Sequence, residues 1–173
     1  MVQPPQPLPA EQRWVQAAVA LGGNLGNSHA ILKAAVVALT QDPKIILLAQ
    51  SHWYQTVAVG PPQPDYLNAC VSLRTQYPPF PFLQKLLRIE AEFGRLRQER
   101  WGPRTLDLDL LLFGNAIVNT PTLTLPHPHL HERAFVLAPL AEICPDWIHP
   151  LYQNSIVDLA KAVDYTGVRQ LPD

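Results

Sequence analysis

The chain has 173 residues, of which 47% are hydrophobic and 16% are charged. This composition is typical of one folded domain of ordinary size and excludes an intrinsically disordered chain. The formal net charge is −1, so global charge does not indicate binding to nucleic acid or to an anionic membrane. Positive charge is concentrated locally, because five of the nine arginines fall within residues 88–104. Such a patch on a neutral protein favours a discrete anionic ligand over a long polyanion.

The cysteines and the N-terminal stretch indicate the compartment. Cys70 and Cys144 are far apart and lack metal-binding spacing, so we expect both to be buried apolar residues. No apolar run is long enough to span a membrane. Residues 1–13 contain four prolines but no basic or apolar signal region, which predicts a flexible leader before a single domain over residues 14–173. These features favour a cytoplasmic protein.

Apolar spacing and turn residues predict the elements in chain order. In the first half of the chain we expect a strand over 14–21, a helix over 28–39 capped by Asn27 or Ser28, a buried strand over 45–49, an aromatic and proline-rich loop over 52–65 and an alternating strand over 66–75. A helix over 82–93, closed by Gly94, is followed by an arginine-rich loop over 95–104 and a strand over 106–113. The last part has short extended segments near 117 and 123 and helices over 135–143 and 156–163. This irregular order predicts an α+β fold with a largely antiparallel sheet covered by helices.

Two acidic residues interrupt an apolar strand in the segment RTLDLDLLLFG, residues 104–114. Because side chains alternate along a strand, Asp107 and Asp109 share one face while the leucines beside them face the core. Two carboxylates this close repel each other unless a positive group lies between them. Mg²⁺ is suited to this role, because it uses one or two carboxylates together with substrate phosphates. The alternative is a pair of solvent-exposed acids on an edge strand.

The arginine-rich loop leads directly into this strand. Its guanidinium groups match phosphate oxygens in bidentate geometry, and with the paired acids they describe a phosphoryl-transfer site. The loop arginines are Arg95, Arg97, Arg100 and Arg104. A solvated loop with ion pairs to nearby glutamates is the alternative interpretation. The glycine-containing segment GGNLGNSHAILK has no Walker motif and is interpreted as a turn before a capped helix.

Several other polar and aromatic residues are weaker candidates. His127, His129 and His131 alternate in PHPHLHER, and a metal site there is a weak alternative to loop histidines that contact a ligand or have no role. The amide of Asn68 suits the edge of a heterocycle, and an aromatic such as Tyr66 or Phe135 offers a stacking face. Ordinary packing is the alternative for each.

Three segments together resemble a known family. GPPQPDYLNACVSLRT, FGRLRQERWGPRTLDLDLLLFG and LPHPHLHERAFVLAPLAEICP occur in this order. They closely resemble the 6-hydroxymethyl-7,8-dihydropterin pyrophosphokinases, over residues 15–150 or so. The resemblance implies a single catalytic domain over 14–173 with a ferredoxin-like α/β/α sandwich. It also implies transfer of pyrophosphate from ATP to the hydroxymethyl group of a reduced pterin, with release of AMP, in tetrahydrofolate biosynthesis.

The resemblance also assigns roles to individual residues. It implies that Asp107 and Asp109 bind two Mg²⁺ ions and form the catalytic set together with Arg97 and Arg104. The positions that match pterin contacts are Thr56, Val57, Val59, Tyr66, Asn68, Trp101 and Phe135. The positions that match ATP contacts are Glu90, Arg95, Arg97, Arg104, Leu110, His127 and Arg133. The implied partners are these two small molecules, with no nucleic acid and no membrane, and the implied state is a monomer.

The chain departs from the family's pattern at a few positions. Gly23 stands where Ser is common, and Leu87, Thr122 and Pro128 differ from residues found in some members. These departures affect the expected ATP affinity but not the expected reaction type.

Two other functions are alternatives. One is a single-stranded nucleic-acid-binding module, in which the paired acids would repel the phosphate backbone of the nucleic acid. The other is a non-catalytic relative that binds pterin.

Overall fold

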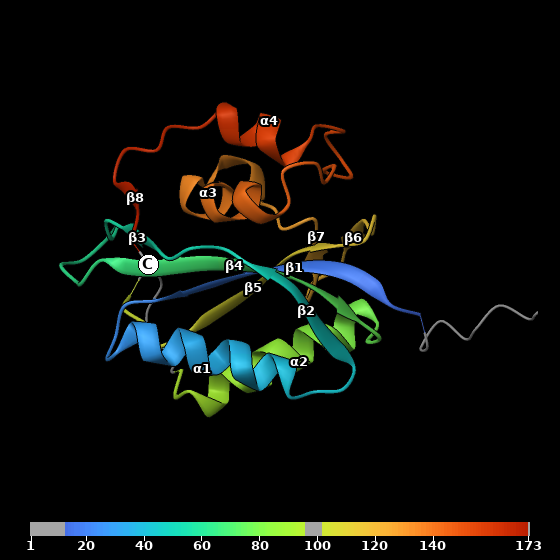
Figure 1. The fold of residues 1–173 in the computed structure, drawn as a ribbon, viewed down its shortest axis with the longest axis horizontal. Coiled ribbons are helices and arrows are strands. Elements are labelled where there is room, and N and C mark those ends of the chain that lie inside the picture. Colours follow the sequence, from blue (N-terminus) through green and yellow to red (C-terminus); the bar gives the residue numbers. More distant parts are fainter. Residues whose placement is uncertain (1–12, 96–101, 173) are drawn as a thin grey trace, which may run out of the picture.

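The computed structural model describes residues 13–95 and 102–172 (Figure 1). Most of the expected leader and residues 96–101 of the arginine-rich loop, which include Arg97, Arg100 and Trp101, therefore lie outside the described residues. No helix within the described ranges is long and apolar enough to cross a membrane.

The centre of the molecule is a six-stranded antiparallel sheet. Five strands follow the order β5-β1-β4-β3-β8, and β2 pairs with the same edge of β4 as β3 does, at the other end of that strand. The strands are β1 (Val15–Gly23), β2 (Ile45–Gln50), β3 (Tyr54–Thr56), β4 (Tyr66–Thr75), β5 (Asp107–Phe113) and β8 (Val168–Gln170). A separate hairpin consists of β6 (Val118–Asn119) and β7 (Thr124–Leu125).

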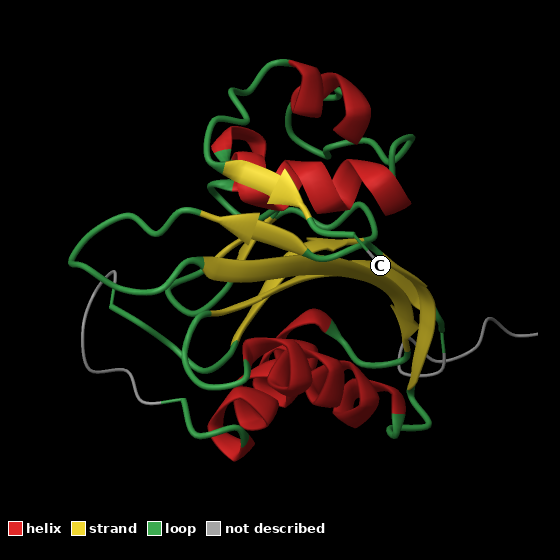
Figure 2. Cartoon of the chain, turned by 60° about the vertical axis from the view of Figure 1, so that its left-hand side comes forward, coloured by secondary structure: helices red, strands yellow, loops and turns green. Residues whose placement is uncertain are grey.

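Helices cover both faces of the sheet (Figures 1 and 2). On one face lie α1 (Ser28–Thr40) and α2 (Pro79–Glu92), and on the other lies α3 (Ala134–Ile143), on which α4 (Ile156–Lys161) packs. A short 3-10 helix, η2 (Leu130–Glu132), precedes α3. The order β1-α1-β2-β4-α2-β5, with β1 between β5 and β4, is that of a ferredoxin-like sandwich. The predicted α+β fold is confirmed.

The two helical layers bury two apolar clusters against the sheet. One cluster lies under α1 and α2 and includes Val71 and Leu73 of β4. The other lies under α3 and α4 and includes Cys70 of the same strand. Alternating residues of β4 therefore face different cores, so a strand with alternating polarity is buried on both sides. Cys70 and Cys144 are both buried free thiols, as expected.

Local signals set several element ends where the sequence predicted them. Asn27 caps α1, since its side-chain oxygen accepts a hydrogen bond from the backbone N–H of Ala30 at 3.1 Å. Gly94 follows α2 with a positive φ of 75°, which glycine adopts at little cost. These interactions join residues that are close in sequence, and this is why a sequence pattern can reveal them.

Two expectations about strands were wrong. The segment 45–49 does form a strand, but Ile46, Leu47 and Leu48 are exposed, and of its apolar residues Ile45 alone is buried in the core. Among the described residues β2 pairs with β4 on one edge only, so it lies at the margin of the sheet. The loop expected over 52–65 contains the short strand β3, and the C-terminal strand β8 was not expected. Both are three residues long, too short to show the alternating pattern that identifies a strand.

Candidate active site

Two cavities share a group of charged residues at the end of the sheet where β1 finishes and β5 begins. Their volumes are about 750 and 730 Å³. Among the described residues, five line both cavities, and all five are charged: Arg95, Arg104, Asp107, Asp109 and Arg133. The structure thus places three arginines and two aspartates, from three separate parts of the sequence, at the junction of two ligand-sized spaces.

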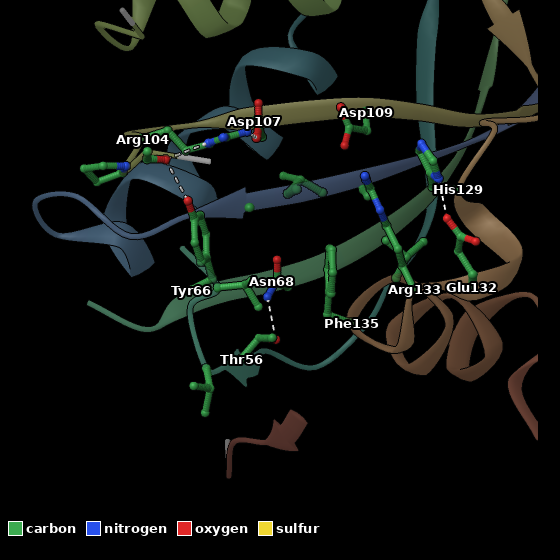
Figure 3. Close-up of a pocket in the computed structure, with 18 of the residues that line it drawn as sticks. Thr56, Tyr66, Asn68, Arg104, Asp107, Asp109, His129, Glu132, Arg133 and Phe135 are labelled. Carbon is green, nitrogen blue, oxygen red and sulfur yellow. Dashed lines mark hydrogen bonds and ion pairs between the residues drawn. The ribbon is translucent and has the colours of Figure 1, made fainter. Parts of the chain in front are cut away.

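The first cavity brings together most residues expected to contact a pterin (Figure 3). These are Thr56 from β3, Val57 and Val59 from the following loop, Tyr66 and Asn68 from β4, and Phe135 from α3. Val57 and Val59 are 59% and 76% exposed, so they form an open rim. Trp101 lies outside the described residues.

Asn68 is the polar centre of this cavity. The residue is 6% exposed, and its side-chain Nδ2 donates a hydrogen bond to Thr56 Oγ1 at 2.8 Å. Its Oδ1 lies toward Gly22 of β1, where a Cβ atom would come within 3.0 Å of it. A buried amide that is held on one side by a hydroxyl has a fixed orientation, which is what recognition of a heterocycle edge requires.

The paired acids occupy the face of β5 that the alternation predicted. Leu106, Leu108 and Leu110 are buried in the core under α1 and α2, while Asp107 and Asp109 line the cavities. β5 is an edge strand, as one alternative required, but the Asp107 side chain is only 20% exposed. A solvent-exposed pair of acids therefore does not describe this site.

Arginines neutralise Asp107 in the structure. Arg95 pairs with one carboxylate oxygen of Asp107, and Arg104 pairs with the other. Arg95 also donates to the carbonyl of Leu106 at 3.2 Å. These two arginines are the described part of the predicted cluster, and both contact Asp107.

The second cavity brings together the remaining residues expected to contact ATP. Glu90 from α2, Leu110 from β5, His127 and Arg133 all line it, together with the shared arginines. Glu90 is buried, and its Oε1 accepts a hydrogen bond from the backbone N–H of Leu108 at 2.7 Å. This bond ties α2 to the strand that carries the acids. Arg97 lies outside the described residues.

The alternating histidines do not form a metal centre. Burial lowers the pKa of His127, as do the positive charges of Arg133 and His129, although Asp109 opposes this effect. His127 Nδ1 accepts a hydrogen bond from the backbone N–H of His129 at 3.2 Å, which requires the neutral ring at that nitrogen. His129 instead pairs with Glu132. In the ranges that the structure describes, no three His, Cys, Asp or Glu side chains form a group able to hold a metal ion.

Asn24 contributes to the site and was missed in the sequence. It is 5% exposed, and its Oδ1 accepts a hydrogen bond from Arg104 N at 2.9 Å. Its Nδ2 donates to Gln63 Oε1 at 3.0 Å and to Pro64 O at 2.8 Å. The side chain therefore connects the loop after β3 to the arginine-rich loop. The only signal was its place in GGNLGN, which predicts a turn.

The absence of a side chain at position 23 allows this connection. A Cβ atom on Gly23 would lie 2.5 Å from the carbonyl oxygen of Thr105, closer than real contacts permit. The backbone N–H of Asn24 donates to Arg104 O at 2.9 Å beside this contact. Glycine at position 23 therefore permits β1 to approach the segment that carries Arg104.

Paired carboxylates among arginines, between two cavities, are typical of enzymes that transfer phosphoryl groups. Comparisons with known proteins show to which family of transferases the chain is similar. Residues 18–145 match the model of the 7,8-dihydro-6-hydroxymethylpterin-pyrophosphokinase family. The 2-amino-4-hydroxy-6-hydroxymethyldihydropteridine pyrophosphokinase of Synechocystis is 47% identical over 165 residues, covering 95% of this chain and 85% of that protein. The enzyme of the same name from Haemophilus influenzae is 44% identical over 148 residues, covering 85% of this chain and 92% of that protein.

Solved structures agree at the level of the fold. A crystal structure of the Plasmodium falciparum HPPK-DHPS protein with pteroate superimposes with a TM-score of 0.70 at 14% sequence identity. The match covers 86% of this chain and 42% of that longer protein. The chain belongs to the 7,8-dihydro-6-hydroxymethylpterin-pyrophosphokinase family.

Proposed function

We propose that this protein transfers pyrophosphate from ATP to the hydroxymethyl group of 6-hydroxymethyl-7,8-dihydropterin, giving AMP and the pterin diphosphate for folate biosynthesis. Membership of the family supports the reaction. The single structural observation that supports it most is the pair of cavities whose shared residues are three arginines and two aspartates. One cavity would take each substrate, and the transferred group would lie between them.

The pterin is assigned to the first cavity. The Asn68 amide keeps one N–H and its carbonyl oxygen for the pterin edge, because its other N–H is engaged by Thr56. Tyr66 and Phe135 offer ring faces for stacking, while Val57 and Val59 supply backbone groups and apolar contacts. Trp101 completes the proposed set from the resemblance alone.

ATP is assigned to the second cavity. Leu110 gives the cavity an apolar wall, and Arg133 is placed to neutralise phosphate charge at the junction. His127 Nδ1 accepts a hydrogen bond from the backbone N–H of His129, so the neutral ring carries its proton on Nε2 and can donate from that atom without adding charge. Glu90 is assigned to this site as a buried residue that fixes the strand beneath it.

The donor set at the junction fits Mg²⁺. Asp107 and Asp109 offer hard oxygen ligands on one face of β5, and two carboxylates leave coordination positions for triphosphate oxygens and water. The family resemblance supports two ions held by these two residues. Bound Mg²⁺ supplies charge neutralisation and orientation of the triphosphate.

The protein's own contribution is positioning and charge. The nucleophile is the hydroxyl of the substrate, so the two cavities must hold it in line with the bond that breaks. Arg104 and Arg97 are assigned to the transferred group, whose negative charge they stabilise in the transition state. Water otherwise competes as the acceptor, and its exclusion is assigned to two loops that act as lids. These are the arginine-rich loop over 95–104 and, of the loop expected over 53–65, the part after residue 57, because β3 and its neighbours hold residues 53–57.

The nucleotide product tests this proposal. The protein is incubated with ATP, Mg²⁺ and 6-hydroxymethyl-7,8-dihydropterin, and the nucleotides are separated by chromatography. Pterin-dependent AMP is expected. ADP would identify an ordinary kinase, and the absence of any nucleotide product would favour a non-catalytic pterin-binding protein. The nucleic-acid-binding alternative is not favoured, because the family match and the paired acids both oppose it.

The resemblance also supports a monomer that acts in the cytoplasm on small molecules alone. Light scattering coupled to size-exclusion chromatography tests the oligomeric state, and fractionation of the source cells tests the location. A stable dimer in solution would contradict the first of these proposals.

A further inference from the structure

The C-terminal strand β8 lies beyond residue 145, where the match to the family model ends. It forms an antiparallel pair with β3, with Tyr54 opposite Gln170 and Thr56 opposite Val168. The other edge of β3 pairs with β4, which places Thr56 beside Tyr66. Without β8, β3 would be a three-residue edge strand, and strands this short gain most of their order from their neighbours.

Backbone hydrogen bonds extend this pairing into the rim of the first cavity. The N–H of Val57 donates to Gly167 O at 3.0 Å, and the N–H of Leu171 donates to Trp53 O at 2.8 Å. Hydrogen-bonded pairs recur at every second residue of an antiparallel ladder, so Gln55 and Arg169 form the hydrogen-bonded pair between these two ends. The whole segment 53–57 is therefore held along one edge by C-terminal residues.

The approach of the C-terminal chain to Val57 depends on a turn. Gly167 has a φ of 81°, which favours glycine, and a Cβ there would lie 3.5 Å from the Cβ of Val57. The N–H of Val168 donates to Tyr165 O at 3.0 Å, and Asp164 Oδ1 accepts from the N–H of Thr166 at 3.0 Å. These bonds shape the turn before it reaches the cavity rim.

Side chains hold β3 from two further directions. Arg169 Nη2 donates to Gln55 Oε1 at 2.7 Å on the exposed surface. The hydroxyl of Tyr54 donates to Glu142 Oε2 at 2.9 Å, which links β3 to α3. Since α3 carries Phe135, this contact relates the two sides of the first cavity to each other.

We propose that β8 is a positioning element for pterin binding, which fixes Thr56 and Val57 against β4 so that the cavity is formed before the substrate arrives. The inference rests on the proposed assignment of the pterin to the first cavity. The Thr56 hydroxyl orients Asn68, so conformational mobility of β3 would make the orientation of the Asn68 amide variable as well. The second cavity has no lining residue from β3 or β8 and should be unaffected.

A matched pair of variants at one exposed position tests this inference. Arg169→Pro removes the backbone N–H at the middle of the ladder, whereas Arg169→Ala removes only the side-chain contact to Gln55. The dissociation constants of 6-hydroxymethyl-7,8-dihydropterin, and of a Mg²⁺ complex of a non-hydrolysable ATP analogue, are measured by fluorescence and calorimetry. For Arg169→Pro we expect the dissociation constant of the pterin to rise about tenfold, because the ladder loses about one hydrogen bond's net stabilisation. The dissociation constant of the nucleotide should change less than about twofold. We expect Arg169→Ala to bind both ligands nearly as the wild type does.

Steady-state kinetics separates positioning from chemistry. The Arg169→Pro variant should raise the KM for pterin while leaving kcat close to that of the wild type. Equal pterin affinity in the Pro and Ala variants would overturn the inference, as would an equal loss of pterin and nucleotide binding, which indicates general destabilisation. If the wild-type protein binds no pterin, the proposed function fails instead.

A measurement on the unmodified protein keeps the test valid if the Pro variant does not fold. Hydrogen exchange by NMR reports whether the Val57 amide is protected in the absence of ligand. Slow exchange at Val57, comparable with amides of β4, is expected. Exchange as fast as in exposed loop residues would overturn the inference, because β8 would then not hold the rim in the free protein.

Discussion

Asn68 Nδ2 donates a hydrogen bond to Thr56 Oγ1 at 2.8 Å, joining two neighbouring strands inside the first cavity. The amide is buried, so each of its polar atoms needs a partner from the protein, water or a ligand. Thr56 engages one N–H and thereby sets which way the amide faces. The free amide edge is then directed at the space assigned to the pterin (Figure 3).

The hydroxyl of Thr56 should control pterin affinity through Asn68. Thr56→Val has nearly the same shape but lacks the acceptor, so the amide loses its orientation and one hydrogen bond. We expect the dissociation constant of 6-hydroxymethyl-7,8-dihydropterin to rise about tenfold, equivalent to about 1.4 kcal/mol. Fluorescence titration measures it. Thr56→Ser keeps the hydroxyl and serves as the control, and Asn68→Ala should weaken binding further. Wild-type affinity in Thr56→Val would contradict this role.

The carboxylates of Asp107 and Asp109 should be essential for turnover. Replacing either by alanine removes a proposed Mg²⁺ ligand, and for Asp107 it also removes the carboxylate that pairs with both Arg95 and Arg104. We expect AMP formation to fall by about 10³-fold or more, as for loss of a metal ligand worth several kcal/mol. Circular dichroism checks the fold. A variant that retains activity close to the wild-type rate, with intact structure, would exclude that residue as a metal ligand.

The guanidinium of Arg104 should act on the chemical step more than on substrate binding. Its backbone N–H is fixed by Asn24 and its side chain lies at the junction of the cavities. For Arg104→Ala we expect the single-turnover rate to fall by about 10²-fold, with pterin affinity changed less than about threefold. Arg104→Lys retains the charge but not the bidentate geometry and should recover only part of the rate. A loss confined to pterin affinity would place Arg104 in the binding site alone.

His149 should make stability fall in mild acid. It is 1% exposed, and its Nδ1 accepts hydrogen bonds from the backbone N–H groups of Leu151 at 3.3 Å and Tyr152 at 3.2 Å. Burial, and then the charge of His131, lower the pKa of His149 below its usual value of about 6.5. As pH falls below about 7.5, the unfolded state therefore binds more protons than the folded state, and the free energy of unfolding decreases.

Urea unfolding between about pH 7.5 and 5.5 measures this effect, to which the lowered pKa of His127 contributes in the same direction. His149→Asn supplies an acceptor oxygen near the position of Nδ1 and does not titrate. We expect its free energy of unfolding to depend less steeply on pH than that of the wild type. Parallel curves for the two proteins would show that His149 does not contribute.

Much of the site was predictable because its signals are local or repeat along one element. The alternation of leucine and aspartate in β5 placed Asp107 and Asp109 on one face, and the structure confirms that arrangement. The cap at Asn27 and the helix end at Gly94 are likewise local. The described residues assigned to pterin and to ATP from the family resemblance do gather in two cavities, whereas their individual roles stay predictions.

The sequence by itself determined the longer helices and strands, in which the pattern of apolar residues repeats several times. It also determined the paired acids and the family motifs. Only the tertiary structure revealed β3 and β8, the exposed face of β2 and the bridging amide of Asn24, because each depends on partners distant in sequence. Gly167 meets Val57, for example, across more than 100 residues of chain, and Asn24 meets Pro64 across 40. Patterns along a chain record which residues seek burial, but the pairing of short segments is decided by the fold that longer elements have already formed.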